Sequence, residues 1–278
     1  MGLRIKSNVP SQMVQKELRK VSGKADESYA KLSSGKRITK SADDAAGLGI
    51  AKKMEAEVRG LRMAQRNANS GISMIQVAEG GLDESSNILT RMRELSIQAA
   101  SDTVGERERG YLNMEYEQLT EEVDRISKTT TFSGSPLLTG ENENGTMDFH
   151  VGAYAGEENK ISFDAQATNA TGSALGIEGT NILDKDNAAS NLEVIDEAID
   201  KVAGFRANFG SIQSRLQSTI SNLDTAATNT ESARSRIEDV DVAEESAKLA
   251  ATNVMKSAGV SSLAQANNIP NSALRLIG

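Results

Sequence analysis

The 278-residue sequence contains no cysteine and no tryptophan, and its only histidine is His150. Disulfide bonds and thiolate metal ligands are therefore excluded, and so is any site that needs two histidines. The sequence also lacks a nucleophile–base pair and a recognisable metal-binding motif. We therefore predict neither an enzyme activity nor a cofactor.

Long apolar runs and a surplus of basic residues are missing as well. No run approaches the roughly 18 apolar residues that a transmembrane helix requires. The net charge is −8, whereas nucleic-acid binding usually needs a basic face. Residues 1–21 have no apolar segment followed by a small-residue cleavage site, so no secretory signal peptide is predicted. Taken alone, these absences favour a cytoplasmic protein that binds neither membrane nor nucleic acid.

Helix breakers and aromatic residues are scarce. The three prolines are Pro10, Pro136 and Pro270, so two long stretches contain no ring that would interrupt a helix. Aromatic residues make up only 3% of the chain, which suits long, thin packing of helices better than a thick globule. We predict a mainly α fold, a long antiparallel helical or coiled-coil bundle, with a different structure in the middle of the chain.

The middle segment, 132–180, holds eight of the 23 glycines. Within it, Thr146–Gly152 and Asn159–Asp164 alternate between apolar and polar residues, which is typical of strands. The intervening Gly156–Asn159 is typical of a turn. The sequence therefore predicts a small β-hairpin region at about 132–180.

The C-terminal arm has the clearest periodicity. Apolar or small residues recur there at steps of three and four from Leu192 to Val240, which indicates a heptad seam and a coiled-coil partner. A second step of three in a row, from Val240 to Ala243, shifts the phase and indicates local overwinding or a joint between two packing units. Beyond it the seam continues with smaller residues, among them Ala243, Ala247, Ala250 and Val254.

The N-terminal arm carries two strong stripes and a weaker outer one. The strong stripes run from Met54 to Met92 and from Leu112 to Ile126, and Ser41 with Asp44 is interpreted as a capping box before the first of them. The outer helix, roughly Gln12–Leu32, has a thin apolar face. Because such a helix is marginal in water, we expect both outer ends to fold only when partners bury them. The outer stripe includes Val9, Met13, Leu18, Val21 and Leu32.

Several segments at both ends resemble one family, the bacterial flagellins. Leu32–Ile38 and Ser41–Ala51 are similar to its N-terminal signature, and Ser235–Ser246 is similar to its C-terminal signature. The resemblance runs in order along essentially the whole chain. Further matches are Arg66–Asn69, Arg93–Leu95 and Ala264–Asn267.

The resemblance implies a filament subunit with two domains. Residues 1–40 and 236–278 would pair as an inner coiled coil lining the filament channel, and residues 41–235 would form a rod-like helical domain. It also implies export by the flagellar type III apparatus, hence a secreted protein of the bacterial flagellum, which overrides the cytoplasmic interpretation. The implied partners are other copies of the chain, cap and hook–filament junction proteins, and an export chaperone on about Val240–Ile277.

Thr90–Ile97 resembles the flagellin segment that an animal innate receptor recognises. Arg91, Leu95 and Glu115 align with the positions that matter there, and the same residues would serve filament packing. The basic run Lys31–Lys40 is interpreted as a subunit contact. Two alternatives to a flagellin remain at this stage: a hook–filament junction protein, or another secreted coiled-coil protein.

Overall fold

The computed structural model describes residues 7–140 and 145–274, and it divides into two compact units. The terminal unit comprises the described residues of Met1–Ala56 and Asn229–Gly278, and the central unit is Glu57–Thr228. The boundary falls within two continuous helices, α2 (Ala45–Ala99) and α5 (Lys185–Glu238). The expectations for residues 1–6, 141–144 and 275–278 lie outside the described residues.

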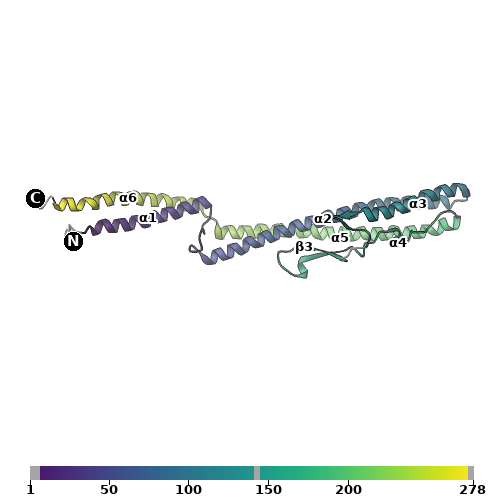
Figure 1. Ribbon diagram of the computed structural model, residues 1–278, viewed down its shortest axis with the longest axis horizontal. Helices are drawn as coiled ribbons and strands as arrows, with labels where there is room; N and C mark the ends of the chain where they lie inside the picture. Colours follow the sequence, from purple (N-terminus) through teal and green to yellow (C-terminus); the bar gives the residue numbers. More distant parts are fainter. Residues whose placement is uncertain (1–6, 141–144, 275–278) are drawn as a thin grey trace. The chain divides into compact units, whose positions relative to one another are not determined.

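The terminal unit is built on α1 (Val9–Ser34) and α6 (Val242–Leu274), which lie side by side (Figure 1). The side chain of Asn8 caps α1 by accepting a hydrogen bond from the backbone N–H of Ser11. Gly35 ends the helix in the left-handed conformation, with φ of 69°. The Gly35 break follows from the residue itself, since glycine adopts this conformation without steric cost.

The predicted face of α6 points away from α1. Ala243, Ala247 and Ala250 are exposed, and Val254 is 69% exposed. Among the α6 side chains that the structure describes, the buried ones are Glu245, Thr252 and Ala266, and they lie on the opposite side. The periodic pattern therefore marks a real helix face, but within one chain this face is not the one that packs on α1.

The start of α2 also differs from the prediction. Asp44, rather than Ser41, caps the helix, because its Oδ1 accepts a hydrogen bond from the backbone N–H of Gly47 at 2.8 Å. Asp43 instead closes the preceding turn by accepting hydrogen bonds from Thr39 and Lys40. The predicted capping box placed the cap three residues too early, since neighbouring aspartates compete for the same role.

The central unit packs α3 (Glu106–Thr129) with the central-unit parts of α2 and α5. Its main apolar cluster confirms the strong stripes of both arms, with Leu82, Leu89 and Met92 from α2 fully buried. The turn before α3 is fixed by Arg109, which donates hydrogen bonds to the carbonyl oxygens of Ala99 and Ser101. The residues that the other two helices contribute to this cluster are Tyr116, Val123, Ile126, Ala188, Ile195, Ala198, Val202, Phe209, Ile212 and Leu216.

The predicted β-hairpin is present. Strands β3 (Thr146–His150) and β4 (Lys160–Asp164) pair antiparallel, and a 3-10 turn (η1, Glu157–Asn159) leads into β4. The apolar side of the hairpin faces the helices: Phe163 is fully buried, and its ring centroid lies 5.4 Å from that of Phe209. The hairpin is therefore part of the central core.

Two small elements were not predicted. Strands β1 (Thr131–Phe132) and β2 (Ser135–Pro136) form a two-residue antiparallel pair directly after α3. The short helix α4 (Gly172–Leu175) lies in the segment between β4 and α5. It is tied to α3, because the Ser127 hydroxyl donates to the Ala170 carbonyl at 2.6 Å and the Gly172 N–H donates to Asp124.

Candidate assembly surfaces

Few apolar side chains are fully buried in the contact between α1 and α6. Within the described part of the terminal unit, the buried apolar side chains are Ala25, Ile38, Ala51 and Ala266. Both contiguous apolar clusters of the described residues belong to the central unit. A unit with so few buried apolar contacts is expected to be the less stable of the two.

Polar groups occupy much of the α1–α6 contact instead. Ser28 Oγ donates a hydrogen bond of 2.6 Å to Glu245 Oε1, and both residues are buried. Near the other end, Ser11 Oγ donates to Asn267 Oδ1 at 2.8 Å. These pairs could not be predicted from the sequence, because only the relative placement of the two helices brings the residues together.

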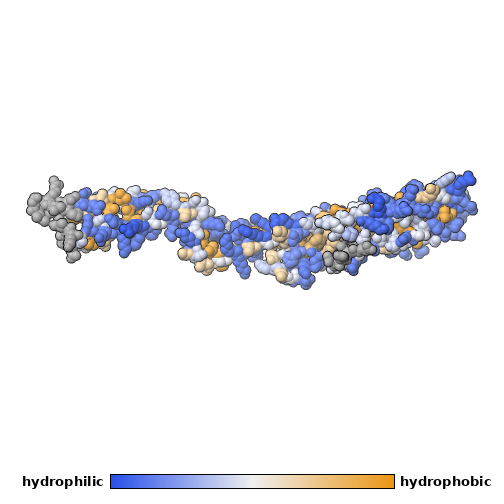
Figure 2. Space-filling model, viewed as in Figure 1, coloured by the Kyte–Doolittle hydropathy of each residue, from blue (hydrophilic) through white to orange (hydrophobic). Residues whose placement is uncertain are grey.

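The outer surface of the terminal unit is apolar at many positions (Figure 2). From the predicted α1 stripe, Val9 is 45% exposed and Met13 is 66% exposed, whereas Leu18, Val21 and Leu32 are half-buried. A groove of about 300 Å³ between the two helices is lined mainly by apolar atoms, with Met13 and Met255 among its residues. Large apolar side chains exposed on the described part of α6 are Val242, Val254, Met255, Val260 and Ile269.

The residues predicted for receptor recognition lie on α2 and α3 of the central unit. Arg91 Nε donates to Glu115 Oε1 at 3.0 Å, so the structure brings these two residues together. Glu94 and Glu115 accept hydrogen bonds from Arg91 and raise the pKa of its guanidinium above the ordinary value. Leu95, in contrast, is 0% exposed and belongs to the central core.

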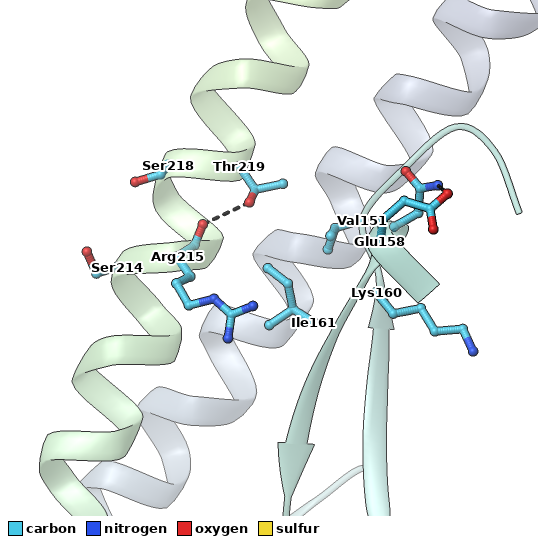
Figure 3. A pocket seen from close by; sticks show the side chains of 9 residues that line it. Val151, Glu158, Lys160, Ile161, Ser214, Arg215, Ser218 and Thr219 are labelled. Atoms are coloured by element: carbon cyan, nitrogen blue, oxygen red, sulfur yellow. Dashed lines mark hydrogen bonds between the residues drawn. The ribbon is translucent and has the colours of Figure 1, made fainter. Parts of the chain in front are cut away.

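Of the grooves in the central unit, one of about 510 Å³ lies between α5 and the end of the β3–β4 hairpin (Figure 3). Arg215 of α5 reaches toward Ile161, and Lys160 extends from β4 nearby (Figure 3). Within the described ranges, no cluster of three or more acidic, histidine or cysteine side chains is placed to hold a metal ion. No helix in the described part of the chain is long and apolar enough to cross a membrane.

The geometry therefore defines a class of protein: a long-helix structural protein with a well-packed central unit and a thinly packed terminal unit that exposes apolar side chains. Comparison with known sequences identifies the family. The N-terminal helical region of bacterial flagellins matches residues 5–143, and its C-terminal helical region matches residues 192–277. The chain belongs to the bacterial flagellin family.

Relatives match over nearly the whole chain. A flagellin of Halalkalibacterium halodurans is 41% identical over 98% of this chain and 99% of its own length. A flagellin of Bacillus subtilis is 36% identical over 99% of this chain and 100% of its own length. A flagellar filament core protein of Brachyspira hyodysenteriae is 38% identical over 98% of this chain and 99% of its own length.

Solved structures agree on the fold. The Bacillus cereus flagellin structure is 29% identical, with a TM-score of 0.51, and covers 61% of this chain and 94% of its own. A putative flagellar hook-associated protein from Vibrio parahaemolyticus has a TM-score of 0.58 at 15% identity, covering 71% of this chain and 100% of its own. At that identity the likeness concerns the fold alone, so the sequence relatives decide between flagellin and a hook-associated protein.

Membership of this family fixes the function. The protein is a structural subunit, not an enzyme, and it polymerises into the bacterial flagellar filament, which lies outside the cell. Swimming motility and export through the flagellar type III apparatus are implied by the family. The 278-residue length fits a short form without large outer domains.

Proposed function

We propose that residues 1–40 and 236–278 form the inner, channel-lining part of the filament and that residues 41–235 form the rod-like part. The observation that carries this proposal is the exposed row Ala243, Ala247, Ala250 and Val254 on the side of α6 opposite α1. Apolar side chains in such a row lose contact with water only when another chain covers them. We name this row the assembly stripe.

Substitution within the assembly stripe tests the proposal. Val254→Glu places a charge at a site that is 69% exposed in the single chain, so the monomer should fold normally. In the filament the same charge would be buried without a partner, which is costly. Polymerisation, followed by sedimentation and electron microscopy, should therefore fall strongly while the circular dichroism and melting of the monomer stay unchanged.

Ala251→Glu is the matched control. Ala251 is also exposed, but it lies on the side of α6 that carries Glu244 and Lys248, which form an ion pair of 2.7 Å. A further acidic residue there should leave polymerisation nearly intact. Equal loss of polymerisation in both variants, or normal filaments from Val254→Glu, would contradict the role given to the assembly stripe.

We propose further that polymerisation completes the folding of the terminal unit. The polar α1–α6 contact gives an isolated chain little stabilisation to offset the ordering of two long helices. Hydrogen exchange of the monomer should be fast in residues 9–34 and 242–269 and slow in the core of the central unit. Strong protection of both outer helices in the monomer would show that they fold without partners.

The finer partners follow from the same surfaces. An export chaperone along about Val240–Ile277 would cover the exposed Val254, Met255 and Val260 before assembly, although residues 275–277 lie outside the described part of the chain. The cap and hook–filament junction proteins would meet the subunits at the two ends of the filament. Val254→Glu should also weaken binding to the cognate chaperone, measured by calorimetry, and unchanged affinity would remove α6 from that interface.

Recognition by the animal innate receptor for flagellin is proposed for Arg91 and Glu115, whose side chains are 50% and 45% exposed. Leu95 would act by supporting α2, since its own side chain is buried. Arg91→Ala and Glu115→Ala should lower the response of receptor-bearing reporter cells without changing the melting temperature much, whereas Leu95→Ala should lower both. No response to the unmodified monomer at saturation would exclude recognition.

A further inference from the structure

Backbone hydrogen bonds join the segment that follows α1 to the segment that precedes α6. Arg37 N–H donates to the Glu238 carbonyl at 2.7 Å, and Val240 N–H donates to the Gly35 carbonyl at 3.1 Å. Lys36 and Asp239 form an antiparallel bridge between them. We name residues 35–37 and 237–240 the clasp. A shift of one residue along either segment would break both hydrogen bonds.

Charged side chains reinforce the clasp. The guanidinium of Arg37 donates to the carbonyl of Ile237 from Nη2 at 2.6 Å and from Nε at 3.2 Å. This carbonyl lies in the last turn of α5, where helix carbonyls lack partners within the helix. Glu238 is 4% exposed and pairs with Lys36 Nζ, while Arg234 Nε lies 3.9 Å from its other oxygen. Part of the basic run Lys31–Lys40 thus has a role within the chain.

A second polar contact lies beyond the clasp. The Ser28–Glu245 hydrogen bond joins two residues that are 6% and 8% exposed, and Lys248 Nζ approaches the second carboxylate oxygen at 3.8 Å. In any other alignment of the helices, the Glu245 carboxylate would be buried without the Ser28 hydroxyl. A buried carboxylate oxygen that loses its hydrogen-bond donor is costly, even with Lys248 near the other oxygen.

The fully buried apolar residues of the contact discriminate poorly between alignments, although the half-buried Leu18 also packs closely on Gly259. Ala25 and Ala266 are the buried apolar residues that α1 and α6 contribute within the described ranges, and alanine fits many positions. A buried polar residue can fix the register of paired helices where apolar residues do not. We propose that the clasp and the Ser28–Glu245 hydrogen bond fix the antiparallel register in which α1 pairs with α6.

The chain's lack of cysteine allows a direct test. Ser11→Cys with Asn267→Cys reports the native register, because these side chains are hydrogen-bonded at 2.8 Å. Ser11→Cys with Val260→Cys reports a register shifted by seven residues. Each double-cysteine chain is copolymerised with an excess of the cysteine-free chain and oxidised mildly, and the disulfide within one chain is quantified by mass spectrometry of peptides.

The perturbing variant combines Arg37→Ala with Glu245→Leu, which removes one positive and one negative charge. The control combines Lys20→Ala with Glu17→Leu, which removes the same charges from an ion pair of 2.9 Å within α1. The perturbing variant should raise the ratio of shifted to native disulfide on the order of tenfold, the factor expected from losing a hydrogen bond to a charged group. The control should leave the ratio unchanged.

The possible outcomes separate this inference from the proposed function on which it rests. A native disulfide in the parent with an unchanged ratio in the perturbing variant overturns the register role, even if total cross-linking falls. Absence of the native disulfide in parent filaments overturns the proposed pairing of α1 with α6 as well. If the perturbing variant does not enter filaments, Glu245→Leu and Glu245→Gln replace it. Leucine should raise the ratio, and glutamine, which still accepts from Ser28, should not.

Discussion

Phe163 of β4 is the residue whose removal should most clearly detach the hairpin from the helices. Its side chain is 0% exposed, and its ring meets that of Phe209 at a centroid distance of 5.4 Å and an interplanar angle of 53°. Phe163→Ala removes this tilted aromatic pair and leaves a cavity at the junction of β4 and α5. Both effects act on the central unit alone.

The expected cost is about 3–5 kcal/mol, as for other buried phenylalanines truncated to alanine. The aromatic pair accounts for about 0.5–1.5 kcal/mol of this. For a unit as long as Glu57–Thr228, each kcal/mol corresponds to a melting-temperature decrease of about 2–4 °C. Phe163→Ala should therefore lower the melting temperature of the central unit by roughly 6–20 °C.

The assay must isolate the central unit, since the two units need not unfold together. The near-ultraviolet circular dichroism of monomers serves this purpose, because the chain has no tryptophan and the fully buried Tyr116 lies in the central core. Ser162→Ala is the control, since Ser162 is exposed on the same strand and should change stability by no more than about 0.5 kcal/mol. A Phe163→Ala shift as small as that of Ser162→Ala would refute the reasoning.

Two further predictions concern the central unit. Gly80 and Gly81 are adjacent in α2, but an added Cβ meets nothing within 4 Å at Gly80 and lies 2.9 Å from Cδ1 of the buried Leu138 at Gly81. In urea titrations, Gly80→Ala should stabilise the monomer by up to about 1 kcal/mol, and Gly81→Ala should destabilise it by about 1–3 kcal/mol. Changes of the same sign in the free energy of unfolding of both variants would contradict this. The hydrogen bond from Lys128 lowers the pKa of Asp124 below its ordinary value of 3.8. The ionised carboxylate therefore contributes its full stabilisation of the folded state above pH 3.8, and this stabilisation is lost as the pH falls through the lower folded-state pKa. The stability gap between the parent and Asp124→Asn should therefore narrow on acidification below about pH 4, and a constant gap would exclude the linkage.

The elements that could be predicted from sequence are those whose periodic apolar residues pack into the core of the central unit. The heptad seam of α5 is confirmed, because Ile195, Val202 and Phe209 recur at the spacing that one helix face requires. The β3–β4 hairpin is confirmed for the same kind of reason, since alternation places Ile161 and Phe163 on one side. In both cases the chain itself supplies the surface that covers the pattern.

The remaining features depend on contacts that periodicity does not describe. The strand pair β1–β2 and the helix α4 are too short to show a periodic pattern of apolar residues. The clasp depends on residues some 200 positions apart, as in the hydrogen bond between Arg37 and Ile237. Periodicity also identified the assembly stripe as a helix face, but it did not say which surface would cover that face.

The orientation of α6 is the reverse of that of a surface helix in an ordinary globular protein. Its polar residues Glu245 and Thr252 are buried, whereas its row of alanines and a valine is exposed to water. If this row packs in the filament as proposed, substitutions in it should leave the melting of single chains unchanged and should show their effects in polymerisation. The tolerance of this protein to mutation therefore has to be judged on the assembled state as well as on the monomer.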